Sequence, residues 1–166
     1  MKKLTVAVLI FILLFVFGNI SFAATSILKK SDSPADTVNN PNAEILANEF
    51  TDTAMAEFSS VSAQISSGVV SFRTHDYAFK MAKTLLDSGI DAKTITMIMQ
   101  KASAWYGNAL VAVYNEKNYS AVIEGYVNKI ADLFNQQQLD VKAQSQIAFM
   151  ATEHLQMMHS LFKDIR

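Results

Sequence analysis

The sequence predicts an all-α protein, a single-domain antiparallel bundle of about five helices that follows a flexible leader. Three observations support this fold class. Apolar residues recur at the spacing of a helix face in every long segment of residues 42–166. Short polar stretches with helix-capping residues separate these segments. The alternation of apolar and polar residues that is typical of a strand is not found.

Residues 1–23 have the three-part layout of a secretory signal peptide. A short basic start precedes twelve consecutive apolar residues, Val6–Phe17, and Ser21 and Ala23 supply the small side chains of a cleavage site. The apolar run ends well short of the about 20 residues that a membrane-crossing helix needs. We therefore expect export, cleavage after Ala23 and no stable membrane span in the mature protein.

Charge and cysteine content narrow the class of protein further. The chain has 15 acidic and 14 basic residues, and Lys2 and Lys3 belong to the expected signal peptide, so the mature protein is mildly acidic. A mildly acidic domain lacks the basic surface that nucleic acids require. The chain has no cysteine, whereas secreted animal domains of this size often depend on disulfides. We therefore expect a bacterial protein, periplasmic or secreted into the medium.

Residues 24–41 are polar, contain two prolines and show no helical period, which indicates a flexible leader. Asn40 and Pro41 are a favourable helix start. The apolar face of the first helix is expected to comprise Leu46, Phe50, Ala54, Phe58, Val61, Ile65, Val69 and Phe72. We expect this helix to bend at residues 66–68. Thr74 is then expected to cap a second, short helix that ends at Ser88 and Gly89.

Asp91 is expected to cap a third helix that carries apolar residues on two sides. The main stripe consists of Ile95, Ile98, Met99, Ala102, Trp105, Tyr106, Ala109, Leu110 and Val113, and the second of Met97, Ala104 and Val111. A helix that is apolar on two sides is covered on two sides, so this helix is expected to be central. Asn118 and Asp140 are expected to cap the fourth and fifth helices.

Several chemistries need residues at fixed spacings that this chain lacks. The five glycines form no phosphate-binding loop, and no Glu-x-x-His pair supports a di-iron bundle. The segment Arg73–Asp76 contains the residue types of an acid/base site, but a helix start with Thr74 as its cap explains the same residues. We predict no catalytic residues, and a small hydrolase of unknown substrate is the third-ranked function.

His154 is the residue with the clearest functional alternative. It lies in the middle of the apolar arc of the last helix, among Met150, Met157 and Met158. A lone imidazole in such a place is usually a core histidine with one hydrogen bond, so we predict no cofactor and no metal. The alternative is an exported bundle that binds haem or copper through His154 and the nearby Met150 or Met158, because imidazole and thioether together suit these ions.

The aromatic side chains give one candidate for partner contact. Trp105, Tyr106, Tyr114, Tyr119 and Tyr126 mostly follow the core stripes, so we expect them in the core with their polar tips near its edge. Phe149 instead falls away from the apolar arc of the last helix, which makes it a candidate contact for a partner. The first-ranked function is therefore an exported, non-enzymatic interaction or accessory protein of the bacterial envelope. A protein partner is expected, and a homo-oligomer is possible.

Protein recovered from its native host is expected to begin at Ala24, because Ser21 and Ala23 occupy the small-residue positions that a signal peptidase recognises. Intact-mass measurement of that material tests the expectation. Retention of residues 1–23 in a membrane pellet would contradict export with cleavage.

Overall fold

The computed structural model describes residues 41–60, 67–115 and 118–165, which all belong to one compact unit, Thr37–Arg166. Five helices make up most of these residues: α2 (Pro41–Ser59), α3 (Ser67–Asp87), α4 (Ala92–Tyr114), α5 (Tyr119–Gln136) and α6 (Val141–Ile165). The predicted all-α bundle is confirmed, and no strand occurs among the described residues. The expected signal peptide, the expected leader up to residue 40, and Val61 and Ile65 lie outside the described residues.

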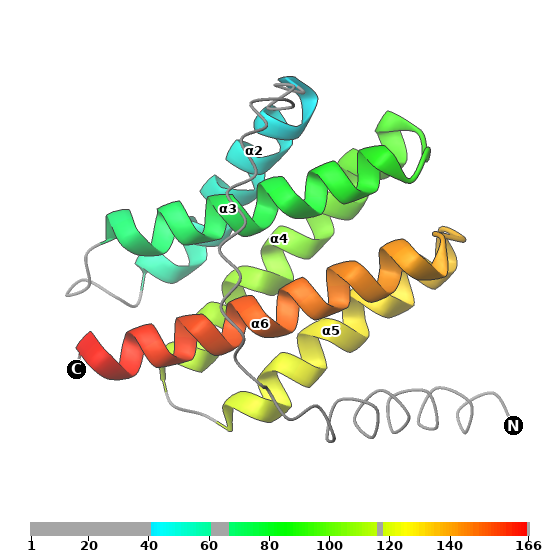
Figure 1. Cartoon of the computed structure of the whole chain (residues 1–166). Helices are drawn as coiled ribbons and strands as arrows, with labels where there is room; N and C mark the ends of the chain where they lie inside the picture. Colours follow the sequence, from blue (N-terminus) through cyan, green and yellow to red (C-terminus); the bar gives the residue numbers. More distant parts are fainter. Residues whose placement is uncertain (1–40, 61–66, 116–117, 166) are drawn as a thin grey trace, which may run out of the picture. The chain divides into compact units, whose positions relative to one another are not determined.

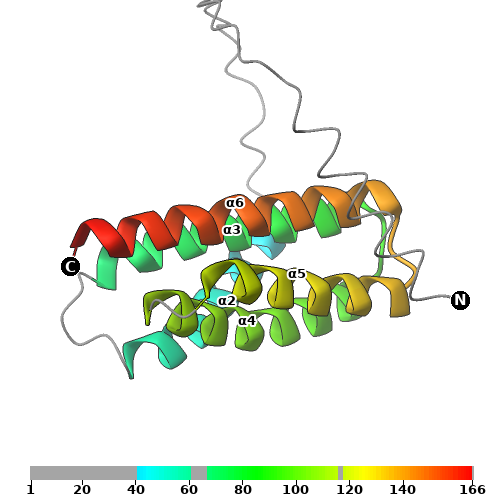
Figure 2. The ribbon, with the colours of Figure 1, turned by 90° about the horizontal axis from the view of Figure 1, so that it is seen from below.

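The helices form two layers (Figure 1). α3 and α6 lie side by side in one layer, and α2, α4 and α5 form the other, with α4 between its two neighbours. Figure 2 shows the same two layers from below. α4 packs against all four other helices, which confirms its predicted central place, although its second apolar stripe is only partly buried. α4 packs more extensively on α2 than on α3, which precedes it in the chain.

The predicted caps of the last three helices are confirmed. Asp91 accepts hydrogen bonds from the hydroxyl and the backbone amide of Thr94, at 2.6 and 3.0 Å, and these bonds lower the pKa of Asp91. Asn118 accepts one from the amide of Ala121 at 3.4 Å. Asp140 accepts two, at 3.1 and 3.2 Å, from amides in the first turn of α6. Each side chain therefore satisfies amides that have no partner within the helix.

The boundary between the first two helices differs from the prediction. The expected long helix ends at Ser59, and α3 runs without interruption through Thr74, which was expected to be a cap. Val69 and Phe72, expected on the core face, are exposed, while Val70 and Thr74 are completely buried.

The physical reason is a second apolar stripe that contains one polar member. Its buried residues are Val70, Thr74, Tyr77, Ala78, Met81, Ala82 and Leu85. A threonine in front of an apolar run is also a common helix start, so the sequence pattern alone does not distinguish a cap from a buried position within a helix. The stripe places Tyr77 in the core, in the layer that α3 shares with α6.

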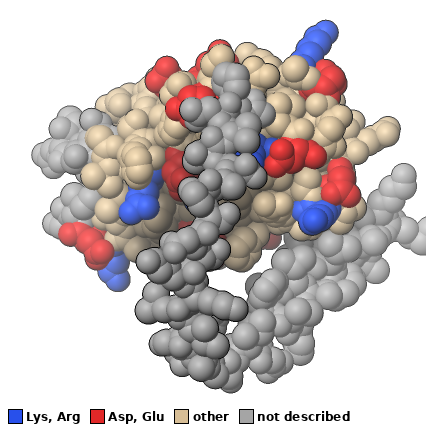
Figure 3. Space-filling view, turned by 45° about the horizontal axis from the view of Figure 1, so that its top comes forward, with Lys and Arg blue, Asp and Glu red and all other residues tan. Residues whose placement is uncertain are grey.

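Within the described ranges, no helix is long and apolar enough to cross a membrane. Where the face in Figure 3 is not drawn in grey, acidic and basic side chains are interspersed.

α2 and α4 approach each other closely at Gly107. A Cβ atom added to Gly107 would lie 3.0 Å from both the Ala54 carbonyl oxygen and the Glu57 Cβ. Exposed Gly125 on α5 has no such neighbour within 4 Å. The absence of a side chain at Gly107 therefore sets how closely these two helices pack.

Gly107→Ala is expected to lower the free energy of unfolding by about 1–2 kcal/mol, because overpacking exceeds the gain in helix propensity. Gly125→Ala is the matched control and is expected to raise it by up to about 1 kcal/mol. Urea unfolding of both variants measures the difference. Equal stabilisation by the two substitutions would show that α2 and α4 can accommodate a Cβ atom at residue 107 without strain.

Candidate functional site

The centre of the bundle is a cluster of rings to which every helix contributes one member. α2 supplies Phe50, α3 Tyr77, α4 Tyr106, α5 Tyr126 and α6 His154. All five residues are buried, and His154 is the most exposed of them at 8%. We call these five residues the ring cluster.

Three rings of the cluster lie in mutual contact. Tyr77 stacks on His154 with ring centroids 5.1 Å apart, and on Tyr106 with centroids 5.3 Å apart. Tyr106 and His154 close the triangle at 5.8 Å. The other two rings pack against this triangle: Tyr126 meets Tyr106 edge-on at 5.7 Å, and Phe50 lies 5.5 Å from Tyr106. The imidazole is thus packed as an aromatic ring.

The polar atoms of the cluster are only partly satisfied. The hydroxyls of Tyr77 and Tyr126 share a hydrogen bond of 3.0 Å. Among the described residues, the Tyr106 hydroxyl, the Thr74 hydroxyl and Nε2 of His154 are buried and have no aligned hydrogen-bond partner. A buried polar atom without a partner costs about 1–3 kcal/mol, so this region combines one satisfied pair of hydroxyls with three unsatisfied polar atoms.

Burial fixes the protonation states in the cluster. It raises the pKa of Tyr77, Tyr106 and Tyr126 well above the ordinary value, so all three phenols stay neutral. Burial lowers the pKa of His154 to about 4. Asp76 raises this pKa, while Lys80 and Arg73 lower it, and both effects are smaller than that of burial. His154 is therefore a neutral imidazole at pH 7.

The residues of α6 that the sequence analysis named as candidates differ from one another in burial. His154 is a core residue, as expected, and its Nε2 has no hydrogen-bond partner within the described part of the chain. Met158 is fully buried one turn later, Met150 is partly buried, and Phe149 is 51% exposed. Nε2 of His154 is buried, so a metal or haem iron could reach it only if neighbouring side chains moved.

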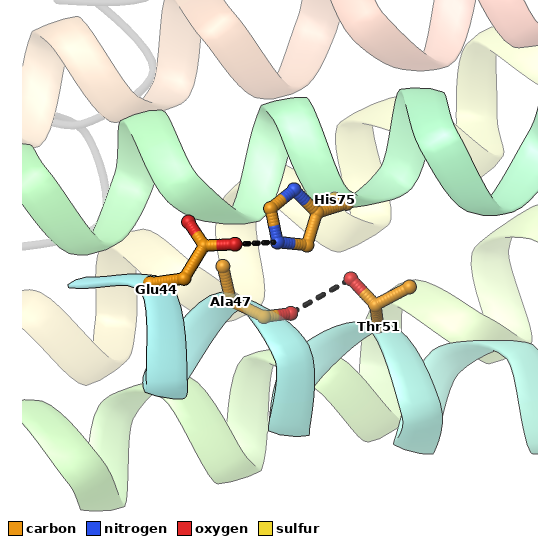
Figure 4. A network of polar contacts seen from close by, with 4 residues as sticks. All are labelled: Glu44, Ala47, Thr51 and His75. Carbon is orange, nitrogen blue, oxygen red and sulfur yellow. Dashed lines mark hydrogen bonds and ion pairs between the residues drawn. The ribbon is translucent and has the colours of Figure 1, made fainter. Parts of the chain in front are cut away.

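The segment Arg73–Asp76 forms no acid/base site, because helix geometry sends its side chains in different directions. Thr74 faces the core, whereas His75 faces α2, where its Nε2 lies 3.2 Å from the Glu44 carboxylate (Figure 4). Asp76 forms an ion pair of 2.8 Å with Lys80, one turn along α3. The expectation that Thr74 caps a helix here is wrong, because Thr74 lies inside α3.

A hollow of about 400 Å³ lies between α2 and α4 and touches the ring cluster only at Phe50. Its lining consists of Leu46, Glu49, Phe50, Asp52, Thr53, Met99, Gln100 and Ser103. The hydroxyl of Ser103 donates a hydrogen bond of 2.8 Å to the carbonyl oxygen of Gln100. No group of three His, Cys, Asp or Glu side chains that could hold a metal ion occurs among the residues that the structure describes.

Comparison of the chain with protein-family models, curated proteins and solved structures found no match. The site is therefore interpreted from its own geometry.

Sequence analysis missed two members of this region and misjudged the depth of two others. Tyr77 and Thr74 were assigned to a short second helix, and nothing in their spacing pairs Tyr77 with Tyr126, which is 49 residues away. The tyrosine tips were expected near the edge of the core, yet Tyr106 and Tyr126 are 0% and 3% exposed. A helical wheel predicts the direction of a side chain but not its depth, so the spacing of apolar residues did not indicate how deeply these tyrosines are buried.

Tyr126→Phe is expected to lower the free energy of unfolding by about 1–3 kcal/mol, because it leaves the Tyr77 hydroxyl buried without a partner. Tyr106→Phe removes a hydroxyl that lies near the Thr74 hydroxyl without an aligned hydrogen bond, and it is expected to cost less. A double-mutant cycle with Tyr77→Phe, measured by urea unfolding, should give a coupling of about 0.5–3 kcal/mol between Tyr77 and Tyr126. Equal losses for Tyr126→Phe and Tyr106→Phe would contradict the assigned hydrogen bond.

Proposed function

We propose that this chain is an exported, non-enzymatic accessory protein of the bacterial envelope that docks on another protein through the outer face of its α3–α6 layer. The observation that carries the proposal is the exposure of large apolar side chains on this face. Phe72 on α3 and Phe149 on α6 are 68% and 51% exposed, and Val69 and Met157 are 45% and 37% exposed. We call these four residues the outer apolar face.

The two phenylalanines of the outer apolar face do not belong to the edge of the hydrophobic core. Phe72 lies between the buried residues Val70 and Thr74 along the chain, and Phe149 lies between Ile147 and Ala151. Two residues correspond to about 200° around a helix, so both phenylalanines point away from the core. Because the bundle buries its own aromatic cluster without them, these side chains remain available to a partner.

The chemistry of the interior supports a non-enzymatic role. The titratable groups that are strongly perturbed by burial are three neutral phenols and one neutral imidazole, and they pack against one another. A general acid or base needs to reach a substrate proton, and these groups are enclosed in the core. This arrangement supports a function that uses the surface of the bundle.

The proposal is tested by capture from the native envelope with the tagged mature protein and its variants. Phe72→Ser and Phe149→Ser are each expected to reduce recovery of the captured protein at least about tenfold, because exposed aromatic anchors dominate interface energies. Ile45→Ser is the matched control, since Ile45 is 56% exposed but belongs to the other layer. Capture that is unchanged in both phenylalanine variants would overturn the proposal.

The outer apolar face could also bind a second copy of the chain, and a separate measurement distinguishes this case from a different partner protein. Sedimentation of the purified protein reports self-association directly. A dimer that dissociates in Phe72→Ser or Phe149→Ser would assign the outer apolar face to a homo-oligomer and would replace the proposed partner.

A soft-metal site at His154 is the second candidate function. The unpartnered Nε2 atom and buried Met158 on the same helix favour it, because copper binds both imidazole and thioether groups. The burial of Nε2 favours a single ion over a haem, because a single ion needs less space. Stoichiometric copper in the purified protein, lost in both His154→Gln and His154→Leu, would favour this candidate over docking.

A further inference from the structure

The hollow of about 400 Å³ between α2 and α4 is bounded by one face of each helix. Four of its lining residues on α2 recur at steps of three and four residues and so share one side of that helix: Leu46, Glu49, Phe50 and Thr53. A single turn of α4 supplies the opposite wall, which consists of Met99, Gln100 and Ser103. The volume of the hollow falls within the range of about 300–1,000 Å³ that is usual for small-molecule sites.

The floor of the hollow is apolar and consists of Leu46, Phe50 and Met99, which are all buried. Phe50 meets the ring of Tyr77 edge-on, with centroids 5.9 Å apart, and its ring centroid lies 5.5 Å from that of Tyr106. These contacts with the ring cluster hold Phe50 in place. The floor is therefore already formed before a ligand enters.

The two hydroxyl groups of the lining donate their protons to backbone carbonyls. The Thr53 hydroxyl donates to the Glu49 carbonyl oxygen at 2.9 Å, and the Ser103 hydroxyl donates to the Gln100 carbonyl oxygen at 2.8 Å. A hydroxyl that donates within its own helix keeps its oxygen as an acceptor. Apart from the side-chain amide of Gln100, the polar side chains that line the hollow therefore offer acceptors, which favours a ligand that donates hydrogen bonds.

The charge of the lining is negative and has no internal counter-charge. Glu49 and Asp52 are exposed, and neither carboxylate forms an ion pair within the described ranges. α2 carries two further carboxylates and no lysine or arginine. Among the described residues, no basic side chain lines the hollow. The hollow therefore attracts a cation and repels an anion.

We propose that the hollow between α2 and α4 binds a small primary amine that carries an apolar body. The apolar body rests on the floor, and the ammonium group donates hydrogen bonds to the carboxylates of Glu49 and Asp52 at the rim. The carboxylates alone would attract any cation, but the buried floor and the acceptor-rich walls select one that has both apolar carbon and N–H groups. The site lies in the layer opposite to the outer apolar face and does not depend on the proposed docking partner.

Titration of the full mature chain with benzylamine, followed through the backbone amide resonances by NMR, tests the site. Saturable shifts centred on residues 49–53 and 99–103 are expected, with a dissociation constant of about 1–10 mM. Benzyl alcohol has the same ring without the charge and is expected to bind at least about fivefold more weakly. Methylamine has the charge without the ring and is expected to bind at least about tenfold more weakly.

Variants of the rim assign the interaction to particular side chains. Glu49→Gln and Asp52→Asn each remove one charge with little change of shape, and each is expected to weaken benzylamine binding about two- to fivefold. Glu57→Gln is the matched control and is expected to leave it unchanged, because Glu57 is an exposed carboxylate of the same helix that does not line the hollow.

Equal affinities for benzylamine and methylamine would overturn the proposal, because they would show that surface charge alone attracts the amine. Equal affinities for benzylamine and benzyl alcohol would overturn it as well, since the carboxylates would then have no part in binding. The same conclusion would follow from shifts that do not saturate, or from equal weakening by Glu57→Gln and Asp52→Asn.

Discussion

The hydrogen bond between the hydroxyls of Tyr77 and Tyr126 is the constraint on which the rest of the structure depends. It joins α3 to α5 across the two layers, and both phenols are buried where water cannot replace a lost partner. A one-residue slip of either helix would separate the two oxygens, so the pair fixes the register of helices that are far apart in sequence. The rings of Phe50, Tyr106 and His154 then fill the space around this fixed point.

Much of the fold was predictable because it depends on local signals. Asp91, Asn118 and Asp140 cap helices as expected, since a capping side chain and its amides lie within three residues of one another. The boundary between the first two helices was predicted wrongly because the local sequence allows Thr74 to be either a helix cap or a buried residue within a helix. Packing against the rest of the bundle selects the buried position. Local pattern predicts helices well, but it does not decide between a cap and a core position when one residue suits both.

The candidate site was predictable only in part, and for a different reason. His154 was recognised because an imidazole inside an apolar arc is conspicuous, and the exposure of Phe149 follows from the same wheel. The neighbours of His154 were not predictable, because Tyr77 and Tyr106 reach it from other helices. Which rings meet depends on the two-layer arrangement, and the spacing of residues along one helix contains no information about it.

The contribution of one ring from every helix has a consequence for how the chain folds. The three helices α2, α3 and α4 precede the α5–α6 hairpin, so during synthesis Tyr77 and Tyr106 are available before Tyr126 and His154. Until α5 packs on the three-helix unit, the hydroxyl of Tyr77 lacks its partner Tyr126 and keeps its hydrogen bonds with water. Water is therefore excluded from the core when the α5–α6 hairpin docks. This makes hairpin docking a late and cooperative step of folding.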